Sequence, residues 1–325
     1  MMKNHSMFKS EQRQLMRALK ASGIDMISLC KPEARYAFIF GLYCWAIVTL
    51  GIYIWPKSPV LSFLIFSIAQ HTMLVLTHEA AHGHLFRNRF LNTAIGNLVF
   101  ALPIGQSVES YRAHHEPHHK HLNTDEDTSF FLTDTRRSVV QTIFTLVTLL
   151  CGRVVWDLIK RTTNGSRAGK DDGIQSNRSK MHVEIQRLIY LLPLHVSVLA
   201  FAYLNSYFAL YVSWVFAAIT LTPFIDGLRT IAEHRIEAER KDGYGETATT
   251  TRSHHRNIFV SLLFSPLFEY HWEHHLLPNI PYSSLRKVHV IALKNNIGAA
   301  RPEPWAIFGA FAKGIRSYDN NKKHK

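Results

Sequence analysis

Apolar residues are concentrated in four uncharged runs along the chain. The runs cover residues 38–55, 59–77, 188–204 and 207–225, and each approaches the roughly 20 residues with which a helix crosses a bilayer. Short polar connections separate the first run from the second and the third from the fourth. We therefore predict an all-α integral membrane protein with about four transmembrane helices arranged as two hairpins.

Three weaker apolar runs lie at 91–108, 139–156 and 257–268. The first and the last contain Pro103 and Pro266, which disrupt a helix interior, and the middle run carries an arginine near its end. We expect these runs to form re-entrant or interfacial helices rather than full membrane spans.

The net charge of +13 is not spread evenly along the chain. Lysine and arginine are frequent before the first run and in the polar stretch 161–182, whereas the connections inside the two predicted hairpins contain Lys57 alone. Positive residues are retained on the cytosolic side of membrane proteins. The N-terminal, central and C-terminal polar regions are therefore expected in the cytosol, and the charge needs no nucleic-acid partner to explain it.

On this basis the chain divides into three regions. Residues 1–36 form a basic, amphipathic cytosolic leader, residues 37–290 form the membrane domain, and residues 291–325 form a cytosolic C-terminal region. The apolar face expected on the leader consists of Phe8, Leu15, Met16, Leu19 and Ile24. The glycine-containing stretch 161–182 is expected to be a flexible linker.

Histidines form three dense clusters, all on the predicted cytosolic side. Their sequences are HEAAHGH at 78–84, HHEPHHKH at 114–121 and HWEHH at 271–275. Side chains three or four positions apart share one face of a helix. That spacing selects His78, His82, His115, His118, His119, His271, His274 and His275. His84 is expected to point away from this face unless Gly83 ends the helix.

Imidazoles clustered in this way indicate metal binding in a cytosolic, histidine-rich cap. Neutral imidazole is a ligand for iron, zinc, copper and nickel. Eight imidazoles exceed one tetrahedral site that keeps room for a substrate, so two metal ions are expected. A histidine-rich membrane metal transporter is the alternative, but a transporter places ionisable residues near the middle of several spans, where only His71 and His195 occur. For these two, and for His114 and His121, a packing or solvated role is the simpler interpretation.

Three segments of the chain resemble a known family. HEAAHGHLF, YRAHHEPHHKHLNTDED and YHWEHHLLPNIPYSSL are similar, in order and separation, to the histidine boxes of the membrane fatty acid desaturase and hydroxylase superfamily. The resemblance covers about residues 60–290. It implies a non-haem di-iron centre at the cytosolic face, with O2 as co-substrate, which removes hydrogen from an unactivated C–H bond of a lipid or fatty acyl chain.

A fatty acid desaturase is the first expectation from this resemblance. A fatty acid or hydrocarbon hydroxylase, or a carotenoid-type oxygenase, is the alternative within the same superfamily. Desaturation and hydroxylation share the first hydrogen abstraction, so the boxes do not separate them.

The resemblance also extends to residues outside the boxes. LRTIAEHRIE is similar to an Arg-x-x-Ala-Glu-His element of bacterial members, which makes His234 a ninth metal ligand. Charged residues near the boxes are candidates for orienting the imidazoles through hydrogen bonds. These candidates are Asp127, Asp226, Arg229 and Glu233. Glu269 is a further candidate because it stands where the family often has asparagine, and this departure leaves the type of oxidation open.

The electrons are expected to come from a separate protein. The chain contains neither a His-Pro-Gly-Gly motif nor a ferredoxin-type set of cysteines, so a ferredoxin or a cytochrome b5 type donor is expected. Lys120, Arg235, Arg240 and Lys241 would suit an acidic partner. The His234 element favours a bacterial inner membrane, with the active site facing the cytosol. The lysine-rich C-terminal end leaves the endoplasmic reticulum as the eukaryotic alternative.

Overall fold

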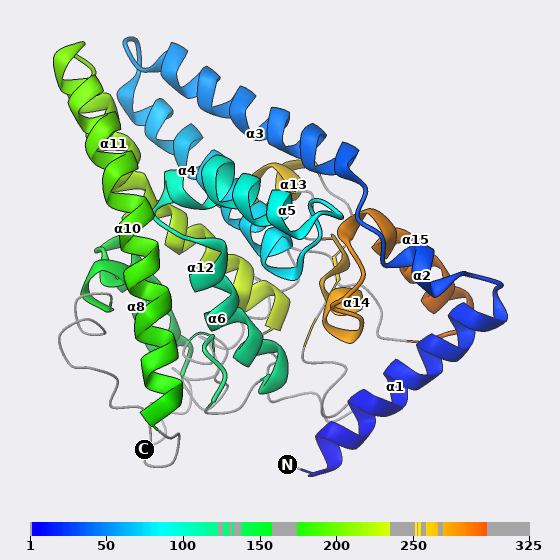
Figure 1. Cartoon of the computed structure of the whole chain (residues 1–325). Coiled ribbons are helices and arrows are strands. Elements are labelled where there is room, and N and C mark those ends of the chain that lie inside the picture. Colours follow the sequence, from blue (N-terminus) through cyan, green and yellow to red (C-terminus); the bar gives the residue numbers. More distant parts are fainter. Residues whose placement is uncertain are drawn as a thin grey trace, which may run out of the picture. The chain divides into compact units, whose positions relative to one another are not determined.

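The computed structural model describes residues 2–122, 126–129, 132, 138–157, 174–234, 251, 253–254, 258–265 and 269–297. Every regular element among these residues is a helix, as predicted (Figure 1). The helices pack into two compact units. We call Glu33–Pro117 with Val147–Asp226 the hairpin unit, and Met1–Pro32, His118–Leu146 and Gly227–Lys325 the terminal unit.

The first predicted hairpin is confirmed by α3 (Ala34–Ile54) and α4 (Pro59–His82). The two helices lie side by side in Figure 1. They pack tightly at Gly51, where an added Cβ would lie 2.5 Å from the ring of Phe66. Ser62 reinforces this contact, because its hydroxyl donates to the Gly51 carbonyl at 2.7 Å. A small residue is therefore required at this point of the hairpin.

The second predicted hairpin is confirmed by α10 (Ile174–Leu204) and α11 (Phe208–Ile219). After Thr220 the chain continues as α12 (Leu221–His234). Helix α10 begins at Ile174, so the prediction of a flexible linker is wrong for residues 174–182. A helix nucleated by an apolar run extends into polar residues at little cost, which explains the difference. The rest of the predicted linker, residues 161–173, lies outside the described residues.

Four helical segments are long and apolar enough to cross a membrane. They are Met26–Ile54, Pro59–Ala81, His182–Leu204 and Phe208–His234. The weaker apolar runs give only shorter helices among the described residues, as predicted. These helices are α5 (Arg89–Ile95), the π-helix η1 (Gly96–Ala101), the 3-10 helix η2 (Leu102–Ile104), α8 (Val139–Leu150) and α13 (Ile258–Phe264).

In the terminal unit the N-terminal helix packs on the third histidine cluster. The helices involved in this packing are α1 (Met2–Ala21), α2 (Met26–Leu29), α14 (His271–Leu276) and α15 (Tyr282–Lys294). Leu15 and Leu19 of α1 are fully buried in one core with Trp272 and Leu276. Met16 and Ile24 pack against the same core. The predicted apolar face is thus confirmed for these four residues, and the Phe8 side chain lies outside the described part of the chain.

Candidate metal centre

The hairpin unit brings together three of the predicted ligands. His78 and His82 lie in the last turns of α4, and His115 lies on α6 (Val108–Lys120). The ring centroids of His78 and His82 are 4.7 Å apart, and those of His78 and His115 are 4.5 Å apart. Arg112 donates from Nε to the Ala81 carbonyl at 2.7 Å, which ties α6 to the end of α4. The predicted i, i+4 face therefore meets the second cluster.

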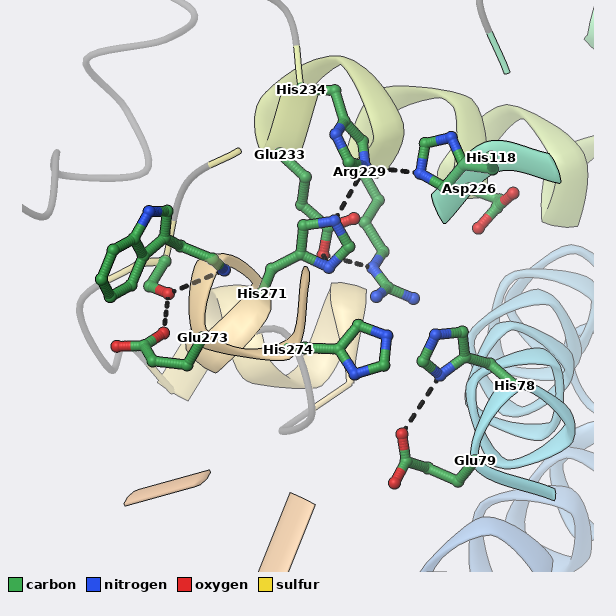
Figure 2. A network of polar contacts seen from close by, with 12 residues as sticks. His78, Glu79, His118, Asp226, Arg229, Glu233, His234, His271, Glu273 and His274 are labelled. Carbon is green, nitrogen blue, oxygen red and sulfur yellow. Dashed lines mark hydrogen bonds and ion pairs between the residues drawn. The ribbon is translucent and has the colours of Figure 1, made fainter. Parts of the chain in front are cut away.

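A buried carboxylate lies beside these imidazoles. Glu79 accepts from Nδ1 of His78 at 3.1 Å and from Nδ1 of His84 at 3.3 Å, and the first contact is drawn in Figure 2. Gly83, at φ +80°, ends α4 in a left-handed conformation. This turn brings His84 back to Glu79. A carboxylate that holds the Nδ1 proton leaves Nε2 of the same ring available to a metal. Sequence reasoning missed Glu79, although a carboxylate directly after a candidate ligand was a usable signal.

The terminal unit gathers the other six predicted ligands from three helices. His118 and His119 end α6, His234 ends α12, and the remaining three lie on α14. The Nε2 atoms of His234 and His271 lie 2.8 Å apart, and those of His234 and His118 lie 3.2 Å apart (Figure 2). The same separation of 3.2 Å joins Nε2 of His119 to Nε2 of His274.

These distances fit a shared metal ion. Two nitrogens that each lie about 2.0–2.1 Å from one ion are roughly 3 Å apart. The ligand atoms of His118, His234 and His275 all lie within 4.8 Å of one another. Nε2 of His275 is buried without a hydrogen-bond partner among the described residues. Burial, together with the neighbouring histidines, holds the pKa of His275 well below its usual range. This ring is therefore neutral, which is the form that binds a metal.

Two of the predicted orienting residues, Asp127 and Glu233, contact predicted ligands, and a third, Arg229, contacts Glu233. Asp127 accepts from Nδ1 of His118 at 2.7 Å. Glu233 lies 3.3 Å from Nδ1 of His271, and it also accepts from Nε of Arg229 at 2.9 Å (Figure 2). Both carboxylates are buried. Each holds the far nitrogen of an imidazole whose Nε2 belongs to the cluster, so both rings are fixed in the tautomer that a metal requires.

The two other candidates occupy different surroundings. Asp226 lies 3.6 Å from Nε2 of His71, which is fully buried in α4. Glu269 is buried directly before α14. Their predicted roles at the metal centre stay predictions.

Histidines outside the predicted ligand set mostly have structural partners. Nε2 of His195 donates to the Leu102 carbonyl at 2.9 Å, and Nδ1 accepts from the Tyr211 hydroxyl at 2.9 Å. His114 donates to the carbonyl of Ser110, four residues earlier on α6, at 2.8 Å. These contacts confirm the structural interpretation of both residues.

Sequence reasoning also missed a network around Glu273 of α14. The carboxylate of Glu273, labelled in Figure 2, is almost fully buried. It accepts from the Ser253 hydroxyl and pairs with Nδ1 of His289 on α15. The Ser253 oxygen in turn accepts from the backbone N–H of Trp272 at 3.1 Å. Glu273 lies two positions after His271 and two before His275, so it projects from a different face of α14 than these two rings, and the network fastens α14 to its surroundings from that face.

Comparisons with known proteins agree with this arrangement. The family model described as fatty acid desaturase matches residues 35–307. The chain is also 28% identical, over 279 residues, to dihydrorhizobitoxine desaturase of Bradyrhizobium elkanii, and the match covers 80% of this chain and 74% of that protein. Since the family model covers most of the sequence, including all nine histidines, the chain belongs to the fatty acid desaturase family.

Proposed function

We propose that the protein is an O2-dependent desaturase of a lipid or fatty acyl chain, with two iron ions held by nine histidines. The proposed ligands are His78, His82, His115, His118, His119, His234, His271, His274 and His275. One observation carries the proposal: Nε2 of His234 lies 2.8 Å from Nε2 of His271 and 3.2 Å from Nε2 of His118. Family membership supports an oxidoreductase over the metal transporter that the histidines alone left open.

Bound iron would supply the activation of O2 that removes hydrogen from an unactivated C–H bond. The contribution of the chain is to hold neutral imidazoles in fixed orientations. Asp127 and Glu233 keep the Nδ1 protons of His118 and His271, and burial keeps His275 neutral. Ligands that carry no charge leave the metal pair more cationic than the carboxylate-rich di-iron sites of soluble bundles.

The surroundings of the centre suit a substrate taken from the bilayer. Four segments can cross a membrane, and a long apolar substrate reaches an enzyme more readily through lipid than through water. We place the centre at the cytosolic face of a bacterial inner membrane, because lysine and arginine are concentrated in the regions that carry the histidines. A separate ferredoxin or cytochrome b5 type protein would deliver electrons. Of the basic residues proposed to meet it, Lys120 is exposed, and the other three lie outside the described residues.

The proposal is tested by producing the protein in a bacterial host together with a ferredoxin and its reductase. We expect purified protein to contain two iron ions per chain, and mass spectrometry of the host lipids to reveal acyl chains that are two hydrogens lighter. Growth under 18O2 separates desaturation, which leaves no label in the product, from hydroxylation, which incorporates it. Unchanged lipids together with iron-free protein would contradict the proposal.

A second candidate substrate comes from the relative in Bradyrhizobium elkanii, whose name specifies dihydrorhizobitoxine. Incubating iron-loaded membranes with dihydrorhizobitoxine, O2, and a ferredoxin with its reductase and NADPH as the source of electrons tests this candidate directly. A product two hydrogens lighter, with host lipids unchanged, would assign the same chemistry to that substrate instead of an acyl chain.

A further inference from the structure

A groove in the terminal unit is not lined by any of the nine proposed ligands. It lies between α1, α2 and the segment 277–280, and its volume is about 860 Å³. Sites for small molecules typically enclose roughly 300–1,000 Å³. The lining combines three cationic side chains with apolar ones, so the groove has the two kinds of surface that an amphiphile requires.

The cationic side of the groove is a row on α1. Arg13, Arg17 and Lys20 are spaced i, i+4 and i+7, so they share one helix face along about 10 Å. All three are exposed, and none forms an ion pair with a described residue. The acidic residue closest to α2, Asp25, is already engaged, because its carboxylate accepts from the N–H groups of Ile27 and Ser28. Among the described residues, the row therefore carries positive charge without an acidic partner.

The apolar side of the groove adjoins the start of a membrane span. Met26 and Ile27 line the groove, and they are also the first residues of the candidate span Met26–Ile54. Ile27 is 71% exposed, which is unfavourable in water and favourable against acyl chains. Met16 and the buried Ile280 complete this side. The apolar side of the groove thus lies only a few residues, along the chain, from the start of the membrane-spanning helix α3 at Ala34.

From this combination we propose that the groove binds an anionic phospholipid. The phosphate-bearing headgroup lies along Arg13, Arg17 and Lys20, and the first carbons of the acyl chains lie on Met16, Met26 and Ile27. Free phosphate would use the cations and leave the apolar side exposed. A zwitterionic headgroup would bring its own positive charge next to the row and bind more weakly.

A lipid at this position would act on the helix that carries the third histidine cluster. Gln12, in the groove wall, donates from Nε2 to the carbonyl of Leu276 at 2.7 Å, and Leu276 is the last residue of α14. A ligand that contacts both α1 and the segment 277–280 would hold α1 against the end of α14. Lipid binding at this groove does not depend on the proposed oxidation, because the groove needs neither iron nor substrate to bind lipid.

The test is a lipid titration of the purified full-length protein by native mass spectrometry in detergent. Dioleoylphosphatidylglycerol, dioleoylphosphatidylcholine and glycerol 3-phosphate are compared as ligands. The test variant carries Arg13→Gln, Arg17→Gln and Lys20→Gln. Its matched control carries Arg286→Gln, Lys287→Gln and Lys294→Gln, which remove the same charge from exposed positions on α15. Ile27→Ser probes the apolar side without touching the buried core.

We expect phosphatidylglycerol to bind the wild type and the control equally, and the test variant about 100-fold more weakly, since each cation near a headgroup contributes about a factor of five. Ile27→Ser should weaken phosphatidylglycerol binding several-fold. Equal binding of phosphatidylglycerol by the test variant and the control would overturn the site. Equal affinity for glycerol 3-phosphate and phosphatidylglycerol would overturn its assignment to a lipid, since the apolar side would then contribute nothing.

Discussion

The Oδ1 atom of Asp127 lies 2.7 Å from Nδ1 of His118. Asp127 is itself fixed, because the same oxygen accepts from the backbone N–H of Ser129 at 2.8 Å. Since a carboxylate can only accept, His118 carries its proton on Nδ1 and turns Nε2 towards His234. The orientation of one proposed ligand thus depends on a residue nine positions further along the chain.

Asp127→Asn should reduce iron affinity and turnover by about 10- to 100-fold while leaving the fold intact. The amide can present N–H instead of an acceptor to Nδ1, which favours the wrong tautomer of His118. Iron content after dialysis against a chelator measures the effect. Glu126→Gln is the matched control, because the carboxylate of Glu126 is exposed and pairs with His121. Equal iron retention by the two variants would contradict the proposed role of Asp127.

His118→Ala should abolish activity and lose iron, whereas His121→Ala should retain most of both. The two residues lie in one cluster, but His118 is buried beside His234 and His275, while the side chain of His121 is 43% exposed. Iron quantification and product formation on the same preparations provide the comparison. Similar losses in both variants would show that shared helix faces do not select the ligands.

Glu273→Gln should weaken iron binding without removing any proposed ligand. The substitution keeps the shape of the side chain but replaces its charge-assisted contacts with Ser253 and His289 by weaker ones. We expect the free energy of unfolding to fall by about 2 kcal/mol and iron to dissociate faster from α14. Thermal unfolding and iron release, measured beside the exposed α15 variant Arg286→Gln, test this. A wild-type rate of iron release would contradict a positioning role.

The stability of the protein should depend on pH through Glu11 of α1. Burial raises the pKa of this carboxyl from 4.5 to about 6, so the folded state binds the proton more tightly than the unfolded state. The ionised form therefore destabilises the fold above about pH 6, and this cost disappears as the pH falls below 4.5. Glu11→Gln cannot ionise, so it should raise the unfolding temperature at pH 7.5 and leave it unchanged near pH 4.5.

Glu33→Gln serves as the control for this pH series. The carboxylate of Glu33 is about one-third exposed and pairs with Arg35 at 2.5 Å, so its removal should not stabilise the protein at pH 7.5. The difference in unfolding temperature between Glu11→Gln and wild type is followed at several pH values. A difference that stays constant from pH 4.5 to 7.5 would show that Glu11 is not the titrating group.

Gly51→Ala should destabilise the first hairpin more than Gly41→Ala does. The new Cβ at position 51 would lie 2.5 Å from the ring of the buried Phe66, whereas at position 41 it would lie 3.3 Å from Phe100. Overpacking of this kind costs about 1–3 kcal/mol. Adding Phe66→Leu to Gly51→Ala should recover part of the lost stability. Thermal unfolding in detergent measures this recovery. If the double variant is no more stable than Gly51→Ala alone, contact with the Phe66 ring is not the cause of the destabilisation.

Much of the membrane-helix arrangement could be predicted, because long apolar runs have few alternatives in a bilayer. The first run, predicted at 38–55, corresponds to a helix over Ala34–Ile54. Ligand selection by spacing also agrees with the clusters, since residues three or four apart on α6 and α14 necessarily share a face. What spacing could not reveal is which far segments meet these faces.

The contacts that were missed arise from tertiary structure. Glu79 reaches His84 only because Gly83 adopts φ +80°, and the partners of Glu273 lie 20 positions before it and 16 after it. The extension of α10 into the predicted linker has a local origin instead, since a helix nucleated by the apolar run propagates into the polar residues before it at little cost. Amphipathicity predicted the apolar face of α1, but the pattern contained no information on α14 as its partner.

The burial of Leu15 and Leu19 beside Trp272 and Leu276 bears on the choice of the translation start. Met16 and Met26 are in-frame alternatives for a translation start. A chain begun at Met26 would keep every histidine of the centre and every membrane span, and its sequence would still match the family. It would nevertheless lack the two leucines that cover one side of α14. If such a shortened protein is inactive, the cause would be the loss of the residues that pack against α14 and support the third histidine cluster. It would not be the loss of a metal ligand.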